Sequence, residues 1–214
     1  MFVTMNFIRG ALFFIFLSLA CNEPVMTSAQ LSVQQQTIDS SLVLHAKNAK
    51  QYGKAHALNA EFCFLIDLSI HSGLPRFFVM DLNNFTCVDS GLVSHGCGHH
   101  LWGWDSSKEN PEVSNEPDSH CSSLGKYKIG NRGVSSWGIH VNYILHGLEE
   151  SNSHAVERQI VLHSWDRIPE KAVYPDGVAE GWGCPAVNDE FMRRLDQRLQ
   201  ASDKKVLLWV YQRS

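Results

Sequence analysis

Five short apolar runs, each bounded by turn-forming residues, constrain the fold of this chain more than any other feature of its sequence. Runs of about four to eight residues that are rich in β-branched and aromatic side chains, and are separated by Gly, Asn, Asp or Pro, are typical of β-strands. The runs are 62–68 (FCFLIDL), 76–82 (RFFVMDL), 86–93 (TCVDSGLV), 160–163 (IVLH) and 206–211 (VLLWVY). The last run is apolar throughout, which predicts a central strand covered on both faces.

Two segments show helical spacing instead. In 38–58, small and apolar residues recur at helical intervals, and Asp39 or Ser40 suits the N-cap position. In 188–201, apolar residues recur every fourth residue, which predicts a second, shorter helix. The periodic positions are Leu42, Leu44, Ala46, Ala49, Tyr52 and Ala55, and then Phe191, Leu195 and Leu199. The whole pattern predicts one mainly β domain of the α+β class over 38–214, with a leading helix.

The amino-terminal segment predicts export. Arg9 is followed by a mostly apolar run of ten residues, 11–20. As a helix this run would span only about 15 Å, half of the hydrocarbon core of a bilayer. We therefore interpret residues 1–20 as a signal peptide and not as a membrane anchor. Cys21 follows directly, as in a lipoprotein signal, so simple cleavage and lipidation of Cys21 both stay open. The polar residues 21–37 are predicted to form a tether.

The charge balance excludes two classes of function. The chain has 214 residues and a formal net charge of −4 at pH 7, and it contains no run of Lys and Arg longer than a pair. A surface that follows nucleic-acid phosphates and a polybasic patch for membranes both need clustered cations. We therefore expect no nucleic-acid partner, and membrane contact only through a lipid on Cys21.

Two glycine-rich segments each present a cysteine that could act as a nucleophile. The segments are 94–100 (SHGCGHH) and 181–187 (GWGCPAV). A nucleophilic cysteine needs a nearby base, backbone amides that can hold an oxyanion, and access to substrate. For Cys184 a base stands at the end of the strand-like run 158–163, because His163 precedes the cysteine by 21 residues. The same two residues also fit a buried structural cysteine and a hydrogen-bonded histidine.

From about Ser40 to its end the chain resembles a known enzyme family. The matching segments are 64–69 (FLIDLS), 76–82 (RFFVMDL), 93–96 (VSHG), 122–127 (SSLGKY), 146–149 (HGLE), Asn152, 158–163 (RQIVLH) and 182–187 (WGCPAV). In this order they resemble the YkuD-type murein L,D-transpeptidases. The resemblance implies a YkuD-like β-sandwich with a short helix after the catalytic cysteine. It also implies that Cys184 is the nucleophile, that His163 is its partner, and that Gly183 supplies an amide to the oxyanion.

The resemblance implies a substrate and a compartment as well. The family acts on peptidoglycan stem peptides, so we expect release of terminal D-alanine, a thioester on Cys184 and 3→3 cross-links, without a cofactor. The implied location is the periplasm or cell envelope of a bacterium. Two departures leave alternatives open: the family's usual motif has Ser or Thr where Gly181 stands, and Arg or Asn where Ala186 stands. The alternatives are an L,D-carboxypeptidase, which uses water as acceptor, and a non-catalytic cell-wall-binding module.

Aromatic residues and histidines near the two motifs are candidates for substrate binding. We expect Trp182, His95 and His146 to contact substrate. Other candidates, which fit core or half-buried positions equally well, are His140, Trp102, Trp104 and Trp165. The polar segment 106–120 (SSKENPEVSNEPDSH) predicts a long surface loop, of a kind that is often functional.

The segment around Cys97 has a metal site as its alternative. His95, Cys97 and His99 alternate, so on a strand they would share one face, and His100 or His120 could add a fourth ligand. The intervening glycines argue against a strand there. Our expectation is therefore exposed loop histidines and no metal.

The remaining cysteines bear on the redox state. The chain has six cysteines. In an exported protein Cys63, Cys87, Cys97 and Cys121 can form up to two disulfides, with three pairings that the sequence does not separate. Cys63 lies in an apolar run, so it is also well explained as a buried free thiol.

Overall fold

The computed structural model describes residues 28–213, with side chains described from residue 40 onward. The chain divides into two units, Met1–Gln36 and Thr37–Ser214, and the fold below is that of the second unit. The predicted signal peptide, residues 1–20, and Cys21 lie outside the described residues. Over the described range, no helix combines the length and the apolar character needed to cross a membrane.

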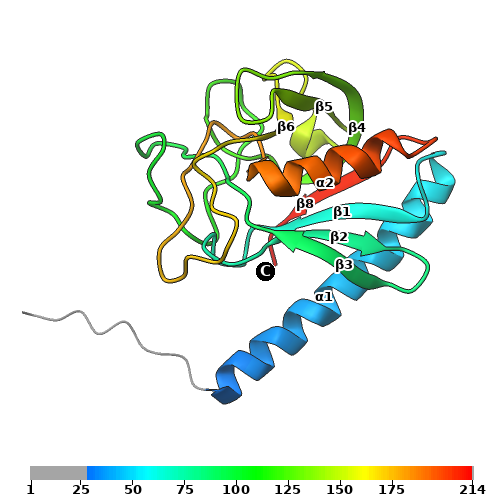
Figure 1. Ribbon diagram of the computed structural model, residues 1–214, viewed down its shortest axis with the longest axis horizontal. Helices are drawn as coiled ribbons and strands as arrows, with labels where there is room; N and C mark the ends of the chain where they lie inside the picture. The colour runs from blue at the N-terminus through cyan, green and yellow to red at the C-terminus, as the bar shows by residue number, and fades with distance from the viewer. Residues whose placement is uncertain (1–27, 214) are drawn as a thin grey trace, which may run out of the picture. The chain divides into compact units, whose positions relative to one another are not determined.

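The second unit is built on one sheet of eight strands in the order β3-β2-β1-β8-β4-β5-β6-β7 (Figure 1). The elements are β1 (Phe62–Asp67), β2 (Phe77–Asp81), β3 (Thr86–Gly91), β4 (Gly125–Val134), β5 (Val141–Gly147), the short helix η1 (Glu150–Asn152), β6 (Val161–Ser164), β7 (Ala186–Val187), α2 (Asp189–Gln200) and β8 (Leu207–Tyr211), preceded by α1 (Ser28–Ala55). All five predicted strands are present, and the mainly β class is confirmed. Strand β8 is central as predicted, because it pairs in parallel with β1 and antiparallel with β4.

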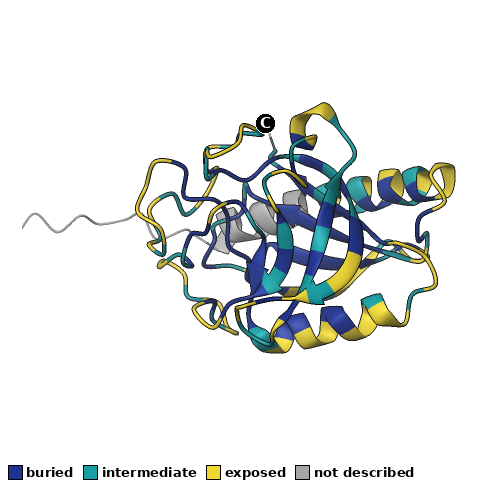
Figure 2. Ribbon diagram, turned by 90° about the horizontal axis from the view of Figure 1, so that it is seen from above, coloured by how far each residue is buried: buried dark blue, intermediate teal, exposed yellow. Residues whose placement is uncertain are grey.

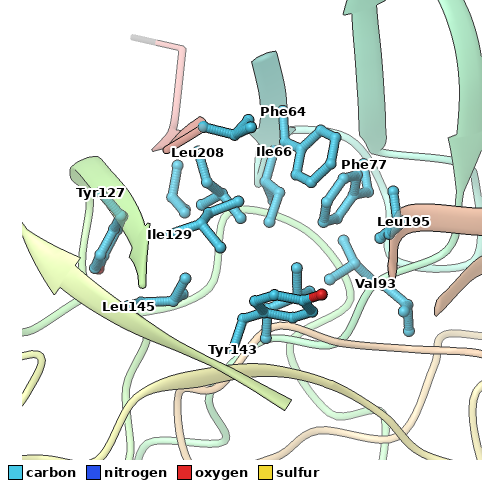
Figure 3. Close-up of a cluster of buried hydrophobic side chains, with 14 of the residues drawn as sticks. Phe64, Ile66, Phe77, Val93, Tyr127, Ile129, Tyr143, Leu145, Leu195 and Leu208 are labelled. Atoms are coloured by element: carbon cyan, nitrogen blue, oxygen red, sulfur yellow. The ribbon is translucent and has the colours of Figure 1, made fainter. Parts of the chain in front are cut away.

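The main core lies on one face of this sheet. Strands from both halves of the sheet and helix α2 contribute to it, so one curved sheet forms the expected sandwich around a shared centre. Figure 3 shows the aromatic rings of Phe64, Phe77 and Tyr143 lying around this centre with Leu195 of α2. At the start of α2, the side chain of Asn188 accepts a hydrogen bond from Phe191 N at 2.8 Å. This N-cap fixes where the helix predicted over 188–201 begins.

The opposite face of the sheet is covered by α1. Leu42, Ala46 and Ala49 of this helix pack against Cys63 and Leu65 of β1 and against the neighbouring strands. The central strands are therefore covered on both faces, and Figure 2 shows them as buried while the turns are exposed. Double coverage explains why these strands are apolar without alternation.

Helix α1 begins earlier than the sequence predicts. It starts at Ser28, so residues 28–36, which the sequence assigns to a polar tether, are helical. The segment SAQLSVQQQ is rich in glutamine, and glutamine is a good helix former even without an apolar face. Helix formation is cooperative, so a helix that packs from residue 40 onward extends into such a segment at little cost. These nine residues are helical, and their role as a tether stays a prediction.

Two long strands escape prediction from the sequence. Strands β4 and β5 form a hairpin whose pairing shifts between Ile129 and Arg132. The outward side of β4 carries Lys126 and Lys128, and two glycines interrupt the rest of the strand. A half-exposed strand with a bulge has little apolar pattern to reveal it.

Candidate active site

Hydrogen bonds from residues 94–97 hold the segment that carries Cys184. Cys97 N donates to Gly181 O at 2.8 Å, and Gly181 N donates to His95 O at 2.8 Å. Ser94 Oγ donates to Cys184 O at 3.2 Å and accepts from Ala186 N at 2.9 Å. One serine hydroxyl therefore fixes the backbone on both sides of the thiol. Its role was not predicted, although Ser94 lies in one of the motifs.

Gly183 gives this segment a backbone that other residues would strain. Its φ is 96°, and a methyl group built on it would overlap the carbonyl oxygen of Cys121. Within the described part of the chain, the amides of Gly183 and Cys184 donate no hydrogen bond. Two successive unpaired amides beside a thiol are the kind of donor pair that holds an oxyanion.

Cys184 and His163 line the same cavity, whose volume is about 360 Å³. His163 lies on β6 opposite Ala186 of β7, in parallel register, and the thiol lies just before β7. Cys184 Sγ accepts a hydrogen bond from Val161 N at 3.3 Å, and Val161 is two residues before His163 on the same strand. Two larger hollows, of about 500 and 620 Å³, contain neither cysteine nor histidine. The fold thus brings the predicted nucleophile and base to one wall of one cavity.

Burial sets the protonation of both groups. It raises the pKa of the Cys184 thiol, although the Val161 amide and the Arg158 guanidinium act in the opposite direction. Burial also lowers the pKa of His163, against the carbonyl of Ser164, which lies 2.9 Å from Nδ1. At neutral pH the resting pair is therefore a thiol and an uncharged imidazole. Because a carbonyl can only accept, Nδ1 carries the proton and Nε2 is the basic nitrogen.

Arg158 places a positive charge next to the segment that bears Cys184. Its guanidinium donates to Cys121 O at 2.5 Å and to Ser123 Oγ at 2.6 Å. A methyl group on Gly183 would lie 3.2 Å from Arg158 Nη2, so the cation stands directly behind the segment that bears the thiol. This arginine lies in one of the matching segments of the sequence, but no role was predicted for it.

Four tryptophan side chains line the cavity. Trp102 and Trp165 stack at a ring separation of 5.2 Å, and Trp137 lies 6.0 Å from Trp165. Trp182 is 60% exposed and stacks on His120 at 5.0 Å. The predicted candidates Trp102, Trp165 and Trp182 all line the cavity, whereas Trp104 does not. Trp137 was missed because it reaches the cavity from the turn between β4 and β5, where no local motif marks it.

The predicted contact between His95 and substrate is wrong. His95 is fully buried and does not line the cavity. Its Nδ1 lies 2.6 Å from Arg76 Nη2, and its Nε2 lies 3.3 Å from Glu180 Oε1. Arg76 and Glu180 are fully buried as well. His95 therefore belongs to a buried polar cluster below the segment that bears Cys184.

Acidification is expected to destabilise the fold through His95. Burial, with the Arg76 guanidinium, lowers the pKa of His95 to about 4, from an ordinary value of 6.5. Between these values the unfolded chain binds a proton that the folded chain does not. Stability is therefore full above pH 6.5 and falls as the pH drops toward 4, by up to about 3 kcal/mol. Urea unfolding midpoints across this range measure the loss. The loss should be smaller in His95→Gln and unchanged in His99→Gln, an exposed control; equal losses in both would contradict the assignment.

His146 does not line the cavity, and its predicted contact with substrate stays a prediction. It sits on β5 opposite Lys128 of β4, and its pKa is lowered by burial and by Lys128 and Lys205. His140 lies exposed in the β4–β5 turn. His146 is thus a half-buried strand residue, whereas His140 is exposed in a turn.

The structure gives no support to a metal site around Cys97. Across the described residues no group of three His, Cys, Asp or Glu side chains is placed to hold a metal ion. His95 is engaged by Arg76 and Glu180, whereas His99 and His100 are exposed. The three alternating residues do not share a face because 94–98 is not a regular strand.

Comparison with known proteins assigns the family. No curated protein matches the sequence. Among solved structures, the helical cell shape determining protein Pgp2 from Campylobacter jejuni is 13% identical in sequence, with a TM-score of 0.46. The match covers 72% of this chain and 48% of Pgp2, so this chain spans about half the length of Pgp2. An L,D-transpeptidase from Xylanimonas cellulosilytica is 12% identical, with a TM-score of 0.35 over 70% of this chain and 60% of that one. The family model of the L,D-transpeptidase catalytic domain matches residues 32–211, which is most of the sequence. The chain therefore belongs to the L,D-transpeptidase catalytic domain family.

Proposed function

We propose that this protein is a cysteine-dependent acyltransferase that acts on peptidoglycan stem peptides, releases their terminal D-alanine and forms 3→3 cross-links through a thioester at Cys184. One observation carries the proposal. A thiol and a neutral imidazole line one cavity, next to two amides that have no acceptor among the described residues. A module that only binds the cell wall has no use for this combination.

In the acylation step, the Cys184 thiol attacks the carbonyl of the third residue of the stem. His163 Nε2 takes the thiol proton as the C–S bond forms, and then gives a proton to the amine of the departing D-alanine. The amides of Gly183 and Cys184 hold the oxyanion of the tetrahedral intermediate. Losing one such donor typically costs about 10²–10³-fold in rate.

In the second step, an amine from a neighbouring stem attacks the thioester and yields the 3→3 cross-link. If water attacks instead, the product is a shortened stem and the enzyme is an L,D-carboxypeptidase. Peptidoglycan lies outside the cytoplasmic membrane, so the proposal includes export by residues 1–20 to the periplasm or cell envelope, with or without a lipid on Cys21.

The cavity also indicates what part of the substrate it accepts. Its lining contains no Asp, Glu, Lys or Arg side chain. The donor therefore places an uncharged portion of the stem against the tryptophans. Two cations flank the cavity: Arg158 lies behind Gly183, and the Arg167 guanidinium lies 5.6 Å from the Trp165 ring. We propose that charged ends of the stem stay outside this cavity.

The experiment that tests the function uses purified protein and a tetrapeptide muropeptide. Release of D-alanine, a mass increase located on Cys184, and a cross-linked dimer are the expected results. D-alanine release without a dimer would replace the transpeptidase by the carboxypeptidase. Labelling at Cys97, or nowhere, would contradict the enzyme proposal.

The pH dependence of kcat/KM is expected to have its acidic limb below 6.5, the ordinary pKa of histidine. Activity requires neutral His163, whose pKa is lowered, so activity falls only when the pH drops below that lowered value. An ionised thiol leaves His163 without the proton that it gives to the departing amine, so activity should also fall when Cys184 ionises. This alkaline limb should lie above pH 9, because burial raises the pKa of Cys184 from its ordinary value of 9.0. Initial rates of D-alanine release across this range measure both limbs. An alkaline limb near pH 8 would indicate a resting thiolate–imidazolium pair instead.

Replacement of Trp182 by alanine is expected to weaken substrate binding more than chemistry. The indole lines the cavity but is 60% exposed, so its loss should leave the fold intact. Loss of an aromatic contact corresponds to a rise in KM of about three- to tenfold, with a smaller change in kcat. Trp104→Ala is the matched control, because Trp104 is 64% exposed and lies outside the cavity. Equal KM values for the two variants would remove Trp182 from the binding site.

A further inference from the structure

Four cysteines besides Cys184 lie in the described part of the chain, and the fold separates them. Cys63 on β1 and Cys87 on β3 both lie opposite Met80 of β2, one on each side of it. Two strand spacings, about 9–10 Å, therefore separate their backbones. A disulfide spans at most about 7 Å between Cα atoms, so these two cysteines cannot pair. Cys97 and Cys121 are 2% exposed and lie in the connection between β3 and β4.

The backbone around Cys121 lies close to the residues on both sides of Cys97, which are Gly96 and Gly98. A methyl group built on Gly96 would lie 2.6 Å from Cys121 Cα, and one built on Gly98 would lie 3.4 Å from Cys121 Sγ. Gly98 N also donates to His120 O at 3.3 Å. The two backbones can approach this closely because both neighbours of Cys97 are glycines.

The two thiols also share one electrostatic environment. Burial raises the pKa of both thiols, and charge on Cys121 raises the pKa of Cys97 further. Thiolate is the species that attacks a disulfide, so two thiols with raised pKa values react slowly at neutral pH and faster in alkali.

We infer that Cys97 and Cys121 form a disulfide when the protein meets a small disulfide donor such as oxidised glutathione. One cysteine thiolate attacks the donor, breaks its S–S bond and releases one glutathione thiol. The second cysteine then attacks the mixed disulfide, forms the Cys97–Cys121 bond and releases the second glutathione thiol. The two cysteines are oxidised, the donor is reduced, and the two cysteine protons end on the two released thiols.

This bond would join the two segments that support the thiol of Cys184. Cys97 holds Gly181 through its backbone amide, and the carbonyl of Cys121 contacts Gly183 and accepts from Arg158. The bond closes a loop of about 25 residues, and its effect on a domain of this size corresponds to a rise in Tm of about 5–10 °C. The disulfide would thus fix the two segments that support Cys184 relative to each other. Its formation can be measured without any turnover.

The test compares the full chain before and after treatment with oxidised glutathione at alkaline pH. Remaining thiols are blocked with iodoacetamide, and the protein is cut with endoproteinase Asp-N, which cleaves before aspartate. The described cysteines then fall on five separate peptides, 39–66, 81–88, 89–104, 118–165 and 176–188. We expect 89–104 to be joined to 118–165. Alkylation of both peptides after oxidation, or a bond from either one to any other peptide, would overturn the inference.

Melting curves give the second readout. Oxidation should raise the Tm of the wild type and of Cys87→Ser, the control on the exposed strand β3, by the same amount. Cys97→Ser and Cys121→Ser should show no rise, and each is compared with its own reduced form, so a general loss of stability in the variant does not affect the result. An equal rise in either variant would show that another event stabilises the oxidised protein.

Discussion

Cys184→Ala is expected to abolish release of D-alanine and formation of cross-links, with a loss on the order of 10⁶-fold. A methyl group cannot attack a carbonyl, and the amides of Gly183 and Cys184 only stabilise an attack that another group must make. The thiol is half-buried and packs at the edge of the main core, so alanine should be tolerated there. The measurement is D-alanine release from a tetrapeptide muropeptide, together with the Tm of the variant.

Cys97→Ala is the matched control for the nucleophile. Its segment SHGC copies the family's usual motif more closely than GWGC does, so it is the strongest competitor of Cys184. Its thiol is buried and lies outside the cavity, and we expect most of the activity to remain. Stability should fall before turnover does. A folded but inactive Cys97→Ala beside an active Cys184→Ala would show that the wrong cysteine was chosen.

Three of the five strands that the sequence predicts are buried on both faces. β1, β2 and β8 stand between the main core and α1, so each residue is selected for apolar character and the run is visible without alternation. β4 and β5 form a hairpin at the border of the cavity, with polar outward residues and a bulge, and their pattern is too weak to read. The first nine residues of α1 also escape prediction, because polar helix formers carry no periodic signal.

The candidate site also contains residues that the sequence predicts and residues that it does not. Cys184 and His163 come with local motifs, a glycine turn and a strand end, and the sequence with its family resemblance was enough to predict that both lie at one site; both line the same cavity. His95 has an equally suggestive motif, but its role depends on Arg76 and Glu180, which lie far away in sequence and bury its ring completely. Trp137 has no motif at all and reaches the cavity only because the β4–β5 hairpin turns there. Sequence therefore reveals residues whose neighbours are local, and not those placed by long-range packing.

His163→Ala is expected to lower the rate of D-alanine release by about 10²–10⁴-fold, the usual contribution of a general acid–base group. The reason lies in the resting state, where burial keeps Cys184 protonated and His163 neutral. Without the imidazole, no side chain that lines the cavity can take the thiol proton. Part of the variant's rate should return at high pH, where the thiol ionises without a base. The ratio of the wild-type rate to the variant rate should therefore fall as the pH rises. Rates at neutral and alkaline pH test this.

Two comparisons separate loss of the base from loss of the site's shape. His100→Ala removes an exposed imidazole near the same region and should keep the wild-type rate. The double variant Cys184→Ala/His163→Ala should be no slower than Cys184→Ala alone, because groups that act as a unit are not additive. If His163→Ala stays as slow in alkali as at neutral pH, its histidine acts by positioning the strand. If the double variant loses a further large factor, the two residues do not act on one proton, and the mechanism proposed for this pair is wrong.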